Sequence, residues 1–84
     1  AYEMAKASGV TFTIESSAVP LLPGTLELIE QGMLTRGDRN NRDYVGDTIR
    51  FEESVSGIVQ SALYDPQTAG GLLISLPAER AEEY

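Results

Sequence analysis

A polar loop that leads directly into an apolar run, over residues 64–74, constrains the fold of this chain more than any other feature. Pro66 fixes its own φ angle and favours an extended conformation at Asp65. Gly70 and Gly71 tolerate positive φ angles and allow another backbone or a ligand to approach closely. The loop also carries hydrogen-bonding side chains, at Asp65, Gln67 and Thr68. It can therefore cradle a phosphate or a substrate with glycine amides, or it can serve only as a tight turn into a buried strand.

The length of 84 residues allows one domain at most, so residues 1–84 are assigned to a single domain. Apolar residues make up 42% of the chain, which is enough for a small core. Residues 1–7 read as the middle of a helix and residues 78–84 as a helix that has just begun. Because neither has the expected capping residues, we expect the chain to be part of a larger domain.

Thirteen acidic and six basic residues give a formal charge of −7, which disfavours binding to nucleic acid. Four arginines fall between residues 36 and 50, with aspartates interleaved. That stretch is either a solvated loop of mixed charge or a local anion site.

Cysteine and histidine are both absent from the sequence. Disulfides, a thiol nucleophile, a histidine base and a zinc site of the usual type are thereby excluded. Any metal would have to be a cation such as Mg²⁺, held by oxygen ligands. No apolar run is long enough to span a membrane and no signal peptide is visible, so we expect a cytoplasmic protein without a membrane partner.

Hydrophobic periodicity predicts helices and strands in alternation. The expected elements are a helix ending near Ser8 and Gly9, a strand over 10–15, a helix over 25–31 stopped by Gly32, a loop over 35–46, a strand over 47–52, a helix over 54–63 capped by Glu53 or Ser54, a strand over 71–76, and a helix starting at Pro77. This order predicts an α/β (α+β) fold with helices packed on a small mixed sheet.

Four stretches of the chain share a pattern with one enzyme family. Residues 65–74 resemble the D-P-Q-T-S-G-G-L-L signature near the C-terminus of selenophosphate synthetase, the selenide, water dikinase family. Residues 3–10 resemble its E-M-A-x-A-S-G-V helix end, and residues 19–24 its V-P-x-L-P-G segment. Residues 39–46 resemble its R-N-x-x-x-Y-x-G loop. The resemblance therefore covers nearly the whole chain, in the same order as in the family.

The resemblance implies part of the C-terminal domain of an enzyme of the aminoimidazole ribotide synthetase-like superfamily. The family makes selenophosphate from selenide, ATP and water, with AMP and phosphate as co-products, and it requires Mg²⁺. Its catalytic cysteine or selenocysteine, its lysine and its Mg²⁺-binding aspartates lie in segments that this chain does not contain. We therefore expect no catalytic or metal-ligating residue here, an inactive isolated chain without bound ATP or Mg²⁺, an N-terminal ATP-binding domain as the partner, and a homodimer.

The resemblance also suggests which residues could line the nucleotide cleft of the whole enzyme. These are Asn40, Asp65, Gln67, Thr68, Gly70 and Gly71; alternatively, they only shape their loops. Two positions depart from the family pattern. Ala69 stands in place of serine and removes a hydroxyl, and Asp38 stands in place of threonine and adds a carboxylate that would oppose an anionic phosphate.

Two other functions fit the sequence. The chain could be the equivalent domain of another ATP-dependent superfamily member, such as a thiamine-monophosphate kinase-like or hydrogenase-maturation protein. It could also be a non-catalytic dimerisation or interaction module, since its acidic surface and apolar-faced helices suit a protein partner.

Overall fold

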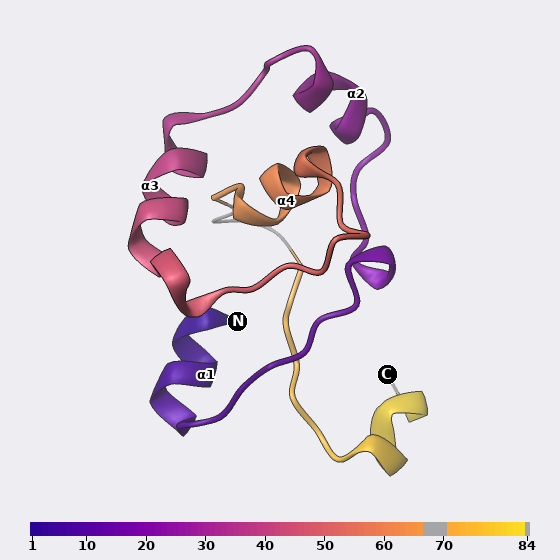
Figure 1. The fold of residues 1–84 in the computed structure, drawn as a ribbon. Helices are drawn as coiled ribbons and strands as arrows, with labels where there is room; N and C mark the ends of the chain where they lie inside the picture. Colours follow the sequence, from indigo (N-terminus) through magenta and orange to yellow (C-terminus); the bar gives the residue numbers. More distant parts are fainter. Residues whose placement is uncertain (67–70, 84) are drawn as a thin grey trace.

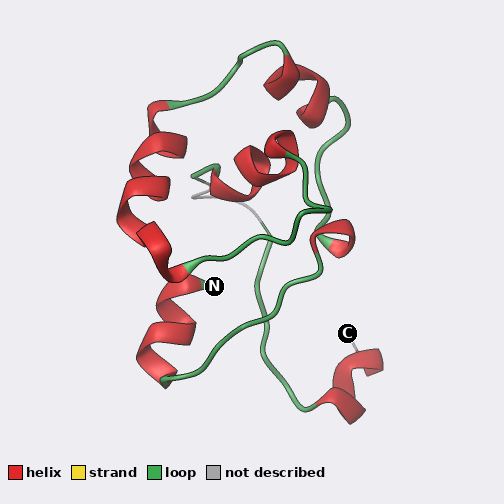
Figure 2. Ribbon diagram, viewed as in Figure 1, coloured by secondary structure: helices red, strands yellow, loops and turns green. Residues whose placement is uncertain are grey.

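The computed structural model describes residues 1–66 and 71–83, which form short helices joined by extended segments (Figure 1). The helices are α1 Tyr2–Ser8, α2 Thr25–Glu30, α3 Arg36–Val45 and α4 Gly57–Tyr64, together with the 3₁₀ helices η1 Ser16–Ala18, η2 Gly46–Thr48 and η3 Ala78–Glu83. Within these residues the secondary structure is helix and loop, with no strand (Figure 2). The predicted small mixed sheet is therefore wrong for this structure.

The end of α1 lies where the sequence predicts it. Gly9 has φ 65° and ψ 33°, a left-handed conformation that suits glycine. Its amide donates to the Lys6 carbonyl at 3.3 Å, and the Val10 amide donates to the Ala5 carbonyl at 3.1 Å. These two bonds form a Schellman motif, which satisfies carbonyl groups that the helix end leaves free. The predicted stop at Ser8 and Gly9 is thus confirmed.

The predicted helix over 25–31 is observed as α2, one residue shorter, with Gly32 after it at φ 83°. The predicted helix over 54–63 is observed as α4, but its cap was predicted wrongly. Ser56 caps α4 by accepting the Val59 amide at 3.3 Å. A turn closed by the Val55 amide and the Glu52 carbonyl, at 3.0 Å, precedes the helix and moves its start beyond Glu53 and Ser54.

The segment 35–46, predicted as a loop, is mostly helix α3. The sequence prediction was wrong because this segment has almost no apolar residues from which a helical period could be recognised. An ion pair between Asp38 and Arg42, four residues apart, supports the helix. Packing against α4 adds the tertiary support that a polar helix needs.

The three predicted strands are extended or turn segments instead. Glu15 and Ile49 have extended backbones, but η1 follows Glu15 and η2 takes up the first part of the segment 47–52. Residues 71–76 are irregular. Alternating apolar residues favour an extended backbone, whereas a strand also needs a neighbour in hydrogen-bonding register. The helix predicted from Pro77 is the 3₁₀ helix η3 rather than an α-helix.

Helix α4 is the centre of the packing and contacts both α2 and α3 (Figure 1). The α1 helix lies beside the C-terminal end of α3, where the rings of Tyr2 and Tyr44 meet edge to face at 5.4 Å. Among the residues that the structure describes, Val45 is the buried hydrophobic residue, with 8% of its surface exposed. Leu22 and Leu72, by contrast, are 81% and 89% exposed. The core is therefore small, and much apolar surface faces outward.

The cap of α4 yields a stability prediction. Ser56→Ala removes the acceptor of the Val59 amide and should lower the free energy of unfolding by about 1 kcal/mol. Thr35, at the same position before α3, makes no side-chain cap hydrogen bond, so Thr35→Ala is the matched control and should cost much less. Urea unfolding curves followed by circular dichroism would measure both, and equal losses would contradict the assigned cap.

Candidate functional site

The signature loop begins where the C-terminal end of α4 meets α3. We call this contact the α3–α4 junction; its members are Gly37, Asp38, Asn41, Arg42, Ser61, Tyr64 and Pro66. The four α3 residues share one face of the helix, because their spacing of one, three and one positions follows the helical period. The junction therefore places one side of α3 against the last turn of α4 and the residues directly after it.

Arg42 makes three contacts at the junction, one within α3 and two across to α4. Its Nε atom donates to Oδ2 of Asp38 at 3.0 Å, and its Nη2 atom donates to Oγ of Ser61 at 2.7 Å. The guanidinium carbon lies 4.5 Å from the centroid of the Tyr64 ring, within cation–π range. Asp38 and Ser61 are both buried. The guanidinium therefore ties a buried carboxylate of α3 to two residues of α4.

Asn41 and Gly37 contact the chain where α4 ends. The Nδ2 atom of Asn41 donates to the Tyr64 carbonyl at 2.6 Å. Gly37 lies so close to the ring of Pro66 that a Cβ atom at this position would overlap the ring. The absence of a side chain at Gly37 is what allows α3 to approach Pro66.

Phe51 holds Tyr64 from the segment that follows η2. The two rings meet edge to face with their centroids 5.8 Å apart. Such aromatic pairs contribute about 0.5–1.5 kcal/mol beyond the area that they bury. Tyr64 is thus held by both its ring and its carbonyl group.

Asp38 differs from the sequence-based expectation. The extra carboxylate was expected to oppose an anion in a loop, but it lies on a helix, is 7% exposed and is paired with Arg42. Its Oδ1 atom is buried and has no hydrogen-bond partner among the residues that the structure describes. The negative charge is therefore balanced inside the junction by the guanidinium.

Of the predicted site residues that the structure describes, none is a member of the junction, and Asp65 lies directly between its members Tyr64 and Pro66. Asp65 is half-buried and follows α4, and its amide donates to the Ala62 carbonyl at 3.3 Å. Asn40 is exposed, and its side chain makes no hydrogen bond to the described residues. Gly71 is exposed beside an apolar groove. Gln67, Thr68 and Gly70 lie outside the described residues.

The sequence prediction singled out Asp38 and Pro66 for other reasons and missed the contacts that the junction residues make with one another. Asn41 and Arg42 follow Asn40 directly and have the same polar character. The available signal was the spacing of Asp38 and Arg42, which is typical of an ion pair on a helix. Recognising it required a helix assignment for the segment 35–46.

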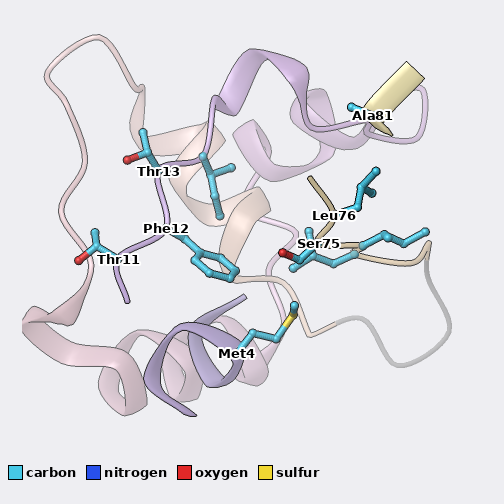
Figure 3. Close-up of a pocket in the computed structure, with 10 residues that line it drawn as sticks. Met4, Thr11, Phe12, Thr13, Ser75, Leu76 and Ala81 are labelled. Carbon is cyan, nitrogen blue, oxygen red and sulfur yellow. The ribbon is translucent and has the colours of Figure 1, made fainter. Parts of the chain in front are cut away.

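Two hollows are lined by residues that the structure describes. The larger, of about 1150 Å³, is lined by α2, the extended segment before it, the end of α4 and residues 71–73. The smaller, of about 460 Å³, lies between the extended segments 11–14 and 73–76 (Figure 3). Met4 and Phe12 extend toward it opposite Ser75 and Leu76. Both hollows are mainly apolar, and of the junction residues Ser61 lines the larger one.

No group of three acidic side chains that could hold a metal ion occurs in the part of the chain that the structure describes. No helix among residues 1–66 and 71–83 has the length and apolar character needed to cross a membrane.

Comparison with known proteins gives matches over nearly the whole chain. It is 46% identical over 81 residues to the selenide, water dikinase of Clostridioides difficile (strain 630), covering 96% of this chain and 23% of that protein. The enzyme of the same name from Clostridium botulinum (strain Alaska E43 / Type E3) is 43% identical over 83 residues, covering 99% of this chain and 24% of the relative. That of Treponema denticola is 44% identical over 80 residues, covering 95% and 22%. No protein-family model and no solved structure matches the chain.

The chain spans about a quarter of the length of the curated relatives it matches. The three relatives belong to one class of enzyme, because the name of each identifies it as a kinase. Over the segment that it spans, the chain belongs to the selenide, water dikinase family.

Proposed function

We propose that this chain is part of the C-terminal domain of a selenide, water dikinase, which makes selenophosphate from selenide, ATP and water and releases AMP and phosphate. The observation that carries the proposal is the similarity to selenide, water dikinases over 95–99% of the chain. The match to the D-P-Q-T-x-G-G-L-L signature supports it. We assign the domain to the aminoimidazole ribotide synthetase-like superfamily.

The role of the segment is to form part of the wall of the nucleotide cleft. The residues proposed to line it are Asn40, Asp65, Gln67, Thr68, Gly70 and Gly71. Side-chain N–H and O–H donors such as those of Asn40, Gln67 and Thr68, and bare glycine amides, suit contact with phosphate oxygens. ATP and Mg²⁺ would be held mainly by parts of the enzyme beyond this chain, which itself supplies no catalytic residue.

The partner of this segment is the N-terminal ATP-binding domain of the same enzyme, working as a cytoplasmic homodimer. The exposed apolar side chains support a covering partner, because an isolated soluble domain rarely leaves a large apolar surface open. Leu22 and Leu72, the most exposed of them, both border the larger hollow.

The test is an activity assay of the full-length protein that carries this segment. With selenide, ATP and Mg²⁺ it should release AMP and phosphate and form selenophosphate, detected by phosphorus NMR. The 84-residue chain alone should form no product and should show no binding of ATP–Mg²⁺ by calorimetry. ATP turnover that does not depend on selenide would overturn the proposed reaction. Sub-millimolar binding of ATP–Mg²⁺ to the isolated chain would overturn the proposal that other parts of the enzyme hold the nucleotide and the metal.

A further inference from the structure

The carbonyl groups at the end of α4 need partners from outside the helix. The last carbonyls of an α-helix have no intrahelical donor. Asn41, on a different helix, supplies a donor to the Tyr64 carbonyl at 2.6 Å. The residue that receives this bond directly precedes Asp65, the first residue of the signature loop. The end of α4 is therefore attached to α3 at the point where the loop begins.

Arg42 limits the rotation of α4 about its own axis. Ser61 and Tyr64 lie three residues apart and so face the same side of α4. The guanidinium contacts both, by a hydrogen bond of 2.7 Å to Ser61 and by stacking at 4.5 Å on Tyr64. Asp38 orients the guanidinium through its bond to Nε at 3.0 Å. A planar group with donors in a fixed fork transmits this geometry better than an ammonium group would.

The contact between Gly37 and Pro66 continues the attachment by two residues beyond Tyr64. Pro66 has a fixed φ angle, so its position and direction are set together. From these contacts we infer that Asn41 and Arg42 are positioning residues: they hold the end of α4 against α3 and thereby set the position of Asp65 and Pro66, with which the signature loop starts. This inference rests on the proposed function, since it assigns the loop a role at the cleft.

The inference is tested by Asn41→Asp in the full-length protein. This substitution keeps the shape of the side chain but replaces the donor to Tyr64 with an acceptor. A displaced loop should lower kcat by about tenfold, the factor that corresponds to a hydrogen bond of typical net strength, and should raise KM for ATP. Arg42→Lys, which keeps the charge but loses the fork, should act in the same direction. The matched control is Asp43→Asn, on an exposed face of the same helix.

Comparing the change in kcat with the change in KM distinguishes a displaced loop from a loss of folded protein. A smaller folded fraction lowers the apparent kcat and leaves KM unchanged, so a raised KM well below the melting temperature supports the inference. It is overturned if Asn41→Asp matches Asp43→Asn in both constants, or if its activity falls only with the folded fraction.

Amide hydrogen exchange tests the inference even if the full-length protein makes no selenophosphate. Failure to make selenophosphate would contradict the proposed function and would leave the inference about Asn41 and Arg42 open to this test. Asn41→Asp should speed exchange about tenfold in a peptide containing Tyr64 and Asp65, with no change in a peptide from α1. Equal exchange of the Tyr64 peptide in Asn41→Asp and Asp43→Asn would overturn the inference.

Discussion

Replacing Gly37 with alanine should destabilise the fold by about 2 kcal/mol, although the same change inside most helices is stabilising. A Cβ atom at this position would overlap Cγ of Pro66 and lie 3.0 and 3.1 Å from its Cδ and Cβ atoms. The proline ring is stiff, so it cannot rotate away as a long side chain would. Relief therefore requires α3 and the end of α4 to separate. The loss would appear as a lower urea midpoint in equilibrium unfolding.

Gly57 provides the control for this substitution. It is the first residue of α4, and a Cβ atom there would meet no atom of the described residues within 4 Å apart from its chain neighbours and the backbone of its own helix. Gly57→Ala should therefore leave stability unchanged or raise it by about 0.4–1 kcal/mol, because alanine restricts the unfolded chain. If Gly37→Ala stabilised the protein as much as Gly57→Ala, the close contact of α3 with Pro66 would be refuted.

Removing the Arg42 side chain has the second large expected effect. Arg42→Ala would leave the buried carboxylate of Asp38 without its partner and would remove the contacts to Ser61 and Tyr64. Breaking a fully buried ion pair costs about 3–5 kcal/mol, and the partial exposure of Arg42 reduces the expected loss to about 2–3 kcal/mol. Thermal and urea unfolding would measure this change.

Two further variants define the origin of that loss. Adding Asp38→Asn to Arg42→Ala should recover part of the stability, because the unpaired charge is then removed. The matched control is Arg80→Ala, which breaks the ion pair between Arg80 and Glu83 in η3, where both side chains are 58% exposed. That substitution should change stability by no more than about 0.5 kcal/mol. Equal losses for Arg42→Ala and Arg80→Ala would show that the junction does not depend on its ion pair.

The elements that could be predicted from the sequence are those with local signals. Gly9 and Gly32 end helices by adopting a backbone conformation that suits glycine, and apolar residues at helical spacing indicate α2 and α4. Helix α3 lacks such a signal, because its stability comes from the pair of Asp38 with Arg42 and from contact with α4. A polar segment of this kind cannot be distinguished from a loop until its partner is known.

The strand predictions were wrong for a different reason. The alternation over residues 10–15 predicted a strand, and Glu15 does have an extended backbone, but a sheet is a property of neighbouring segments. Leu72 and Leu73, in the run predicted as a strand over 71–76, are 89% and 58% exposed. Their sequence encodes a preference for burial, and nothing in the described part of the chain covers them.

The sequence motif located the candidate site, but the contacts that the site makes could not be predicted from the sequence. Asp65 and Pro66 were identified because proline and the glycines after it have recognisable backbone effects. Asn40 was chosen from the family pattern, whereas the hydrogen bond to Tyr64 is made by its neighbour Asn41. Which of two adjacent asparagines faces α4 depends on how the residues of α3 are arranged around the helix axis. That arrangement could not be predicted while the segment was assigned as a loop.

The segment 71–76, exposed over residues 71–75, has a consequence for handling the chain in solution. It contains no charged residue and no proline, and such a run, left open, can pair with copies of itself in the manner of cross-β aggregates. Pro77 follows immediately, and Glu79, Glu82 and Glu83 come next. Such residues beside an aggregation-prone segment act as gatekeepers: proline lacks an amide donor, and glutamates repel one another by charge. We therefore expect this acidic flank to help keep the isolated 84-residue chain in solution.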